Sequence, residues 1–245
     1  RDLIMDNPPA GGPKDWDVAT SAKPEEIMKI FPDSFYENEF GTVGVKVEKF
    51  IDNGFLNPDR EHDVIEVTTF RIESKYSDKR RPDKVEFAKT LEEDLSRRDF
   101  TINAIALKLK TKNEKRKTDD YKIVDLFGGR EDIRNRIIQT VGDPHERFDE
   151  DALRMMRAVR FHAELGFDIE KKTFEAIKKY SKDLKHIALE RIKDELTRII
   201  LSDNPAEGID IIHQTGLLDY VIPELEKGVG VKQNRHHIYT IYKHS

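Results

Sequence analysis

The feature that most constrains the fold is a change in hydrophobic periodicity near residues 142–149. Before this point, short segments alternate between apolar and polar residues, which is the period-two pattern of β-strands. After it, apolar residues recur every three or four positions, as they do in amphipathic helices. We therefore predict an α+β protein with two domains, a mixed domain with a small sheet over residues 1–145 and an all-helical domain over residues 146–245.

The same patterns predict individual elements. The expected strands cover residues 16–20, 42–48, 62–72, 102–110 and 121–125, and a basic stretch over 112–117 is expected to be a hairpin tip. The expected helices cover residues 24–31, 150–165, 171–179, 189–201 and 206–215. Gly166 and Gly216 are the expected stop signals of two of these helices.

Composition excludes several classes of protein. The 245 residues contain no cysteine, which excludes disulfides, thiolate zinc sites and a cysteine nucleophile. No apolar run approaches the roughly 18–20 residues that a membrane helix needs. The net charge of −5 argues against a nucleic-acid partner, but a local basic surface is compatible with a negative total. The first residue is Arg1 rather than Met, so we expect a piece of a longer protein.

Asp15 and Asp17 form the first candidate site. Residues i and i+2 of a strand point to the same face, so the two carboxylates would lie side by side. Two such charges repel unless a cation lies between them, and Mg²⁺ prefers oxygen ligands. The alternative is a solvated turn or strand end, where this spacing of aspartates is common.

Glu66 is the second candidate. It lies among β-branched residues in the predicted strand 62–72, where a buried carboxylate would be costly. Facing Asp15 and Asp17, it would serve as a third carboxylate in a two-metal site or as a general base. The alternative is an edge-strand glutamate that faces solvent.

Residues 97–104 place two arginines, a carboxylate, a hydroxyl and an amide close together. The guanidinium of Arg98 suits phosphate oxygens, and Asp99 and Asn103 can hydrogen-bond a ribose hydroxyl. The alternative is a salt-bridged helix start.

The fourth candidate is a ridge of residues spaced by three on the predicted helix 150–165, namely Asp151, Arg154, Arg157 and Arg160. An aspartate accepts and an arginine donates, so a fixed pair of them could read the edge of a base, while further arginines would meet phosphates. The alternative is a surface helix with ion pairs between neighbouring turns. That alternative is weakened because only one acid opposes three arginines along the ridge.

Together these motifs resemble the bacterial tRNA nucleotidyltransferase and poly(A) polymerase family, the class II CCA-adding enzymes. Arg1-Asp2 is similar to the end of the motif GGxVRD, and Asp15-Trp16-Asp17 to the metal-binding DxD. Residues 97–104 are similar to RRDFTINA, residues 124–133 to DxxGGxxDL, and residues 150–161 to EDxLRxxRAxRF. Glu190-Arg191 and Glu195-Leu196 resemble the helical motif that follows.

The resemblance implies a nucleotidyltransferase head of the DNA polymerase β type followed by a helical neck and the start of a body. Asp15 and Asp17 would bind two Mg²⁺ ions, with Glu66 as the third catalytic carboxylate. Arg1 and Arg98 would bind nucleotide phosphate or ribose. Asp151 and Arg154 would select CTP and then ATP, and Arg157 and Arg160 would complete the pocket. The basic segment 74–86 falls where the family has a flexible loop.

The resemblance also implies the reaction. The protein would be a cytoplasmic enzyme, without a membrane partner, that adds CMP and AMP to the 3′ end of tRNA. The alternatives are a poly(A) polymerase, a specialist that adds only CC or only A, and a non-catalytic RNA-binding module. We expect the glycine pair that cradles the triphosphate in the family to lie before Arg1, and Gly11-Gly12 lies in a different place and does not substitute for it. His236, His237 and His244 are not assigned as metal ligands.

Overall fold

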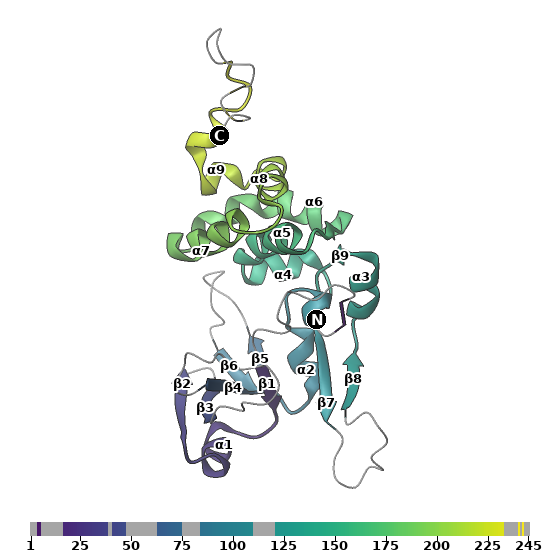
Figure 1. Cartoon of the computed structure of the whole chain (residues 1–245), viewed down its shortest axis with the longest axis vertical. Helices are drawn as coiled ribbons and strands as arrows, with labels where there is room; N and C mark the ends of the chain where they lie inside the picture. Colours follow the sequence, from purple (N-terminus) through teal and green to yellow (C-terminus); the bar gives the residue numbers. More distant parts are fainter. Residues whose placement is uncertain are drawn as a thin grey trace. The chain divides into compact units, whose positions relative to one another are not determined.

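The computed structural model describes residues 4–5, 17–38, 41–47, 63–74, 84–109, 121–232, 240 and 242. These residues form two compact units, the first ending at Arg134 and the second beginning at Asn135 (Figure 1). The α+β class is confirmed, because strands and helices mix in the first unit and helices dominate the second. The domain limits expected at 145 and 146 stay a prediction. No helix in the described ranges has both the length and the apolarity to cross a membrane.

The first unit is built on a four-stranded mixed sheet with the order β1-β4-β3-β2. β1 runs parallel to β4, whereas β3 is antiparallel to both β4 and β2. Helix α1 covers one face, where Ile27 packs against Val43, Val45 and Val67. The opposite face of β4 is open at Val64 and Glu66. The elements are β1 (Asp17–Thr20), α1 (Pro24–Ile30), β2 (Ser34–Asn38), β3 (Thr42–Val47) and β4 (Asp63–Thr69).

Two antiparallel strand pairs, β5–β6 and β7–β8, complete the first unit together with short helices. Helix α2 begins with a capping box, since Thr90 accepts the N–H of Glu93 and the Glu93 side chain accepts the N–H of Thr90. The elements are β5 (Arg71–Ser74), β6 (Lys84–Phe87), α2 (Leu91–Ser96), the 3-10 helix η1 (Thr101–Asn103), β7 (Ile105–Leu109), β8 (Tyr121–Asp125) and α3 (Gly129–Asn135).

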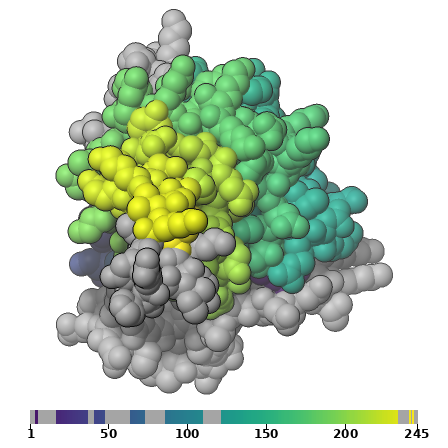
Figure 2. All heavy atoms as spheres, turned by 90° about the horizontal axis from the view of Figure 1, so that it is seen from above, coloured from purple at the N-terminus to yellow at the C-terminus, as the bar shows by residue number. Residues whose placement is uncertain are grey.

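The second unit is a helical bundle with one short parallel strand pair, β9–β10. Its core includes Phe148, Met155, Met156 and Ile199, which are fully buried. Helices α8 and α9 contact α7, and Figure 2 shows the yellow and yellow-green residues of the last elements beside the green residues that precede them. The elements are β9 (Ile137–Ile138), α4 (Pro144–Glu150), α5 (Leu153–Leu165), β10 (Asp168–Ile169), α6 (Lys171–Tyr180), η2 (Ser181–His186), α7 (Leu189–Ile200), α8 (Pro205–Gln214), α9 (Leu218–Val221) and α10 (Pro223–Glu226).

Most of the expected elements that fall on described residues are confirmed, including the two stop signals. Gly166 and Gly216 have φ of +63° and +74°, a backbone conformation that favours glycine. The hairpin tip expected over residues 112–117 lies outside the described residues.

Three expected elements are wrong in part. The strand 62–72 is broken at Phe70, whose N–H donates to the carbonyl of Thr20 at 2.7 Å and whose carbonyl accepts the N–H of Ala88 at 2.7 Å. The strand 102–110 begins only at Ile105, because a 3-10 turn precedes it. The helix 150–165 is interrupted at Asp151, which has extended backbone angles.

Candidate active site

Asp17 and Glu66 lie side by side on neighbouring strands. Asp17 is the first residue of β1, and its register partner on the parallel strand β4 is Glu66. Partners in neighbouring strands are about 4.8 Å apart and point to the same face. Both residues are exposed. The alternative interpretation of Glu66 is wrong about an edge strand, because β4 lies between β1 and β3, but it is correct that the side chain is exposed.

The row that contains these carboxylates continues across the sheet through a glycine. Glu66 pairs with Gly44 on β3, and Gly44 pairs with Phe35 on β2. A Cβ at Gly44 would lie 2.5 Å from Cζ of Phe35, so the ring covers this position. The carboxylate pair is therefore bordered by an aromatic ring.

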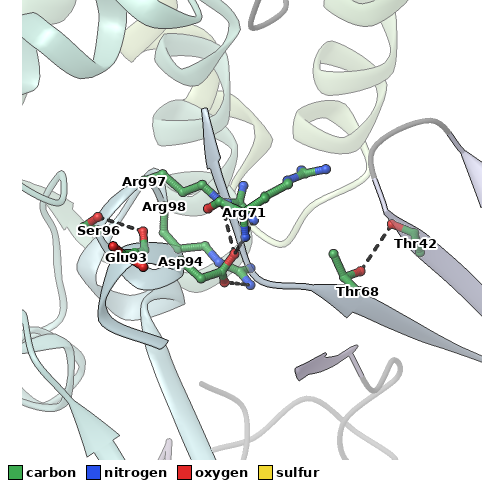
Figure 3. A network of polar contacts seen from close by, with 8 residues as sticks. All are labelled: Thr42, Thr68, Arg71, Glu93, Asp94, Ser96, Arg97 and Arg98. Carbon is green, nitrogen blue, oxygen red and sulfur yellow. Dashed lines mark hydrogen bonds and ion pairs between the residues drawn. The ribbon is translucent and has the colours of Figure 1, made fainter. Parts of the chain in front are cut away.

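A buried carboxylate holds the two arginines that follow α2. Asp94 is 1% exposed. Its Oδ1 accepts hydrogen bonds from Arg97 Nη2 at 2.7 Å and Nε at 3.1 Å, and its Oδ2 accepts one from Arg98 Nη2 at 3.2 Å (Figure 3). The salt-bridged alternative is thus correct about the ion pairs, but these residues lie at the end of a helix rather than at its start.

The charge of Asp94 is maintained by these arginines. Burial by itself would raise the pKa of Asp94, but Arg97 and Arg98 outweigh this effect and hold the pKa below its ordinary value of 3.8. Asp94 is therefore an ionised acceptor at neutral pH.

Asp99 and Asn103 contact each other directly. Asp99 is buried, and its Oδ1 accepts the N–H of Phe100 at 2.8 Å and the side-chain amide of Asn103 at 3.3 Å. The next turn is fixed to α3, because the hydroxyl of Thr101 donates to Asp132 at 2.5 Å. The structure thus brings together the polar groups predicted at 99 and 103.

Helix α3 approaches this turn closely. A Cβ at Gly129 would lie 2.1 Å from the carbonyl oxygen of Thr101, which no side chain could tolerate without a shift. Asp125 accepts the N–H groups of Gly129 and Arg130, each at 2.9 Å, and so caps the start of α3. The segments 97–104 and 124–133 therefore form one packed substructure.

In the second unit, Asp151 precedes α5 rather than lying on it. Its Oδ1 accepts the N–H of Leu153 at 3.0 Å, which starts the new helix, and its Oδ2 accepts Nη2 of Arg191 at 2.9 Å. This cap is the physical reason why the expected continuous helix is wrong at this point. Asp151 is half-buried.

Arg154 lies one turn further along and is buried. It donates to the carbonyl of Arg147 at 3.2 Å and forms a short ion pair with Glu150. Glu150 also pairs with Arg147 at 2.7 Å, so that one carboxylate links two arginines. Asp151 and Arg154 are therefore each held in place by two partners.

Arg160 is paired in the core. Its Nη1 lies 3.2 Å from Glu195 on α7, and its Nε lies 3.6 Å from Glu164. Burial raises the pKa of the Glu195 carboxyl, against the opposing charges of Arg160 and Arg157. The expectation that a single acid opposes the arginine ridge is wrong, because Glu150, Glu164 and Glu195 all contribute.

Arg157 is half-buried, with its guanidinium 5.6 Å from the centre of the Phe161 ring. Two of the predicted site residues, Arg1 and Asp15, lie outside the described residues, as do Gly11-Gly12, residues 75–83 and the histidines 236, 237 and 244. Within the described residues no group of three or more His, Cys, Asp or Glu side chains is arranged to hold a metal ion.

The contacts that fix the predicted site residues in place were not predicted from the sequence. Asp94 stands three and four positions before Arg97 and Arg98, the spacing of helical ion pairs, and the capping box from Thr90 to Glu93 would have indicated the helix. Arg191 belongs to a motif that the sequence shows, but no local pattern indicated its contact with Asp151, because forty positions separate the two residues.

The fold and these motifs define a class of protein. The chain belongs to the poly(A) polymerase head domain family, since the model described as "Poly A polymerase head domain" matches residues 1–139. A second model, described as "Probable RNA and SrmB- binding site of polymerase A", matches residues 166–228. The resemblance inferred from the motifs is therefore confirmed.

The similar curated proteins are named CCA-adding enzyme. The one from Ligilactobacillus salivarius (strain UCC118) is 49% identical over 207 residues, which are 84% of this chain and 46% of the relative. The one from Bacillus cereus (strain B4264) is 46% identical over 222 residues, 90% of this chain and 49% of the relative. The chain thus spans about half the length of the curated relatives it matches.

A solved structure has the same fold. The crystal structure of the Bacillus stearothermophilus CCA-adding enzyme in complex with CTP superposes with a TM-score of 0.72 at 39% identity. The match covers 94% of this chain and 50% of that one. The expected head with a helical neck is therefore confirmed as a fold.

Proposed function

We propose that this chain is the catalytic part of a nucleotidyltransferase that adds CMP and AMP, from CTP and ATP, to the 3′ end of tRNA. The observation that carries the proposal is the register pairing of Asp17 with Glu66 in a chain that is 49% identical to a CCA-adding enzyme. This chain contains no cysteine, which is compatible with a cytoplasmic enzyme.

Mg²⁺ fits the donors at this position. Two exposed carboxylates on adjacent strands repel each other, and a hard divalent cation relieves that repulsion while leaving room for phosphate oxygens. Asp17 and Glu66, with Asp15, would hold two such ions. When bound, they would lower the pKa of the attacking hydroxyl and neutralise charge on the phosphates.

The remaining residues would bind and orient the substrates. Arg1 and Arg98 would bind phosphate oxygens, and Asp99 with Asn103 would hydrogen-bond the ribose. The 3′-hydroxyl of the RNA would then attack the α-phosphorus, the bond to the bridging oxygen would break, and pyrophosphate would leave.

Base selection would fall to residues of the second unit. Asp151 and Arg154 offer an acceptor and donors in fixed positions, which supports their reading of a base edge. Arg157 and Arg160 would complete the pocket, with Arg160 acting through its buried contacts. The hydrogen-bonding partners of these side chains support the proposal, because polar side chains that discriminate between bases must be held rigidly.

The proposal is tested by nucleotide incorporation. The full-length protein is offered tRNAs that lack three, one or none of the terminal CCA nucleotides, with labelled CTP and ATP separately. We expect CC followed by A, and no extension of the complete end. Long products from ATP alone would instead indicate a poly(A) polymerase, which the name of the family model also suggests.

A matched pair of variants tests the carboxylates. Asp17→Asn should reduce incorporation to background without changing the melting temperature. Glu25→Gln, which neutralises an exposed carboxylate on α1, should leave incorporation unchanged. Full activity of Asp17→Asn would refute the metal assignment.

A further inference from the structure

Asp94 is not one of the motif residues to which the family resemblance gives a role in substrate binding. It is nevertheless among the most deeply buried charged side chains of the described first unit, with 2% of its side chain exposed. Burying a carboxylate is unfavourable unless it is paired, so its position calls for a reason beyond helix stability.

The two carboxylate oxygens of Asp94 have different partners (Figure 3). Oδ1 binds Arg97 twice and also accepts the backbone N–H of Arg71 at 3.3 Å. Oδ2 accepts Nη2 of Arg98 at 3.2 Å. Arg97 is thereby fixed to the protein, while Asp94 is the described partner of a second arginine that is still 34% exposed.

The network is attached to the strand that carries Glu66. Arg97 Nε also donates to the carbonyl of Arg71 at 3.0 Å, so both backbone groups of Arg71 are bound. Arg71 is the first residue of β5 and is separated from β4 by Phe70 alone. The same Phe70 donates to Thr20 at the end of β1, the strand of Asp17.

Arg98 retains donors for a ligand. A guanidinium carries five N–H groups, and the contact with Asp94 uses one of them. Its Nε is buried without a hydrogen-bond partner among the described residues. An arginine that is already oriented loses less conformational entropy when it binds phosphate oxygens.

We propose that Asp94 is a positioning residue that holds Arg98 in place, relative to the strands of Asp17 and Glu66, to bind the triphosphate of the incoming nucleotide. This inference rests on the proposed function. Because the triphosphate is common to CTP and ATP, the contribution of Asp94 is independent of the base.

The test is a double-mutant cycle with Asp94→Asn and Arg98→Ala on the full-length protein. In Asp94→Asn the amide oxygen can still serve Arg97, while the amide N–H₂ faces Arg98 and cannot accept from it. We expect KM to rise about tenfold for CTP and ATP alike, equivalent to ~1.4 kcal/mol. The double variant should have the KM of Arg98→Ala, because Asp94 acts through that residue. Additive effects on KM would overturn the proposal.

Two control variants on α2 separate positioning from stability. Thr90→Ala removes the cap of the helix and should lower the melting temperature without raising KM. Glu92→Gln neutralises an exposed carboxylate on the same helix and should change neither quantity. If Asp94→Asn does not fold, Asp94→Glu replaces it, and its longer side chain should raise KM less than Arg98→Ala does. An equal rise in KM for Thr90→Ala would overturn the proposal.

Equilibrium binding of inorganic tripolyphosphate distinguishes this inference from the proposed function. Weaker binding by Asp94→Asn supports the positioning role even if the wild-type protein incorporates no nucleotide. Unchanged tripolyphosphate binding, together with normal incorporation by the wild-type protein, would overturn the inference while the proposed function stands.

Discussion

The ion pairs of Asp94 in the first unit and of Arg160 in the second match arginines with acids in different ways. In the first unit one buried carboxylate, Asp94, is shared by Arg97 and Arg98, which both remain partly exposed. In the second unit, the arginine Arg160 is itself buried and has two acids, Glu164 and Glu195, around it.

This difference indicates where free charge is available. Arg98 shares its acid with Arg97 and keeps donors with which it can still bind an anion. The buried Arg160 has two acids around it that compensate its charge, and its ion pair with Glu195 links α5 to α7. Net charge is therefore a poor guide to anion binding, because the distribution of partners matters more than the total.

The comparison is tested most severely by Arg160→Ala. This change would leave Glu195 buried without its ion-pair partner, so we expect a loss of about 3–5 kcal/mol of unfolding free energy. Urea denaturation would measure it. The double change Arg160→Met with Glu195→Leu should recover most of this loss, because it removes both charges, and a failure to recover would refute the packing role.

Asp94→Asn should have the next largest effect, a loss of about 2 kcal/mol at pH 7, because it weakens hydrogen bonds to charged groups. The pKa of Asp94 is lowered on folding, so its contribution is present above the ordinary value of 3.8 and is lost as the pH falls through the folded-state pKa. Wild type and variant should therefore converge in stability as the pH falls through the lowered pKa of Asp94 in the folded state. Parallel stability curves down to acid pH would contradict this.

Asp125→Ala should cost less, about 1 kcal/mol, because it removes a helix cap rather than a buried ion pair. Thermal unfolding followed by circular dichroism would measure the loss. Asp125→Asn keeps one acceptor oxygen and serves as the control with a smaller loss.

Lys178→Ala should have the smallest effect. Lys178 lies 3.6 Å from Glu175 on the exposed face of α6, with both side chains about half exposed. We expect a change of less than about 0.5 kcal/mol, which high salt abolishes. A loss comparable to that of Asp94→Asn would show that exposure does not distinguish these pairs.

Local sequence patterns correctly predicted the elements that are determined by residues close together in the sequence. The alternation through Val43 and Val45 and the glycines at 166 and 216 led to the correct strand and helix ends. The break at Phe70 could not be predicted in this way, because its hydrogen bonds go to Thr20 and Ala88, remote in sequence.

The candidate site likewise contains some contacts that the sequence predicts and others that depend on tertiary packing. Asp17 and Glu66 were predicted to face one another, and their register pairing agrees, although their roles stay predictions. The contact of Arg191 with Asp151 depends on the packing of α7 beside α5, which no local pattern specifies. Sequence motifs thus predict which groups belong to the candidate site, whereas tertiary packing determines which groups hold them in place.

The corner at Phe70 has a consequence for the dynamics of the first unit. Its amide proton is bonded to β1 and its carbonyl to the residue after β6, so exchange of that proton with solvent requires the strands to separate. Local fraying of β5 would not be sufficient. We expect the amide proton of Phe70 to exchange as slowly as the amide protons in the middle of β4. Strands β1 and β4, which carry Asp17 and Glu66, should open together with Arg71, whose carbonyl binds Arg97.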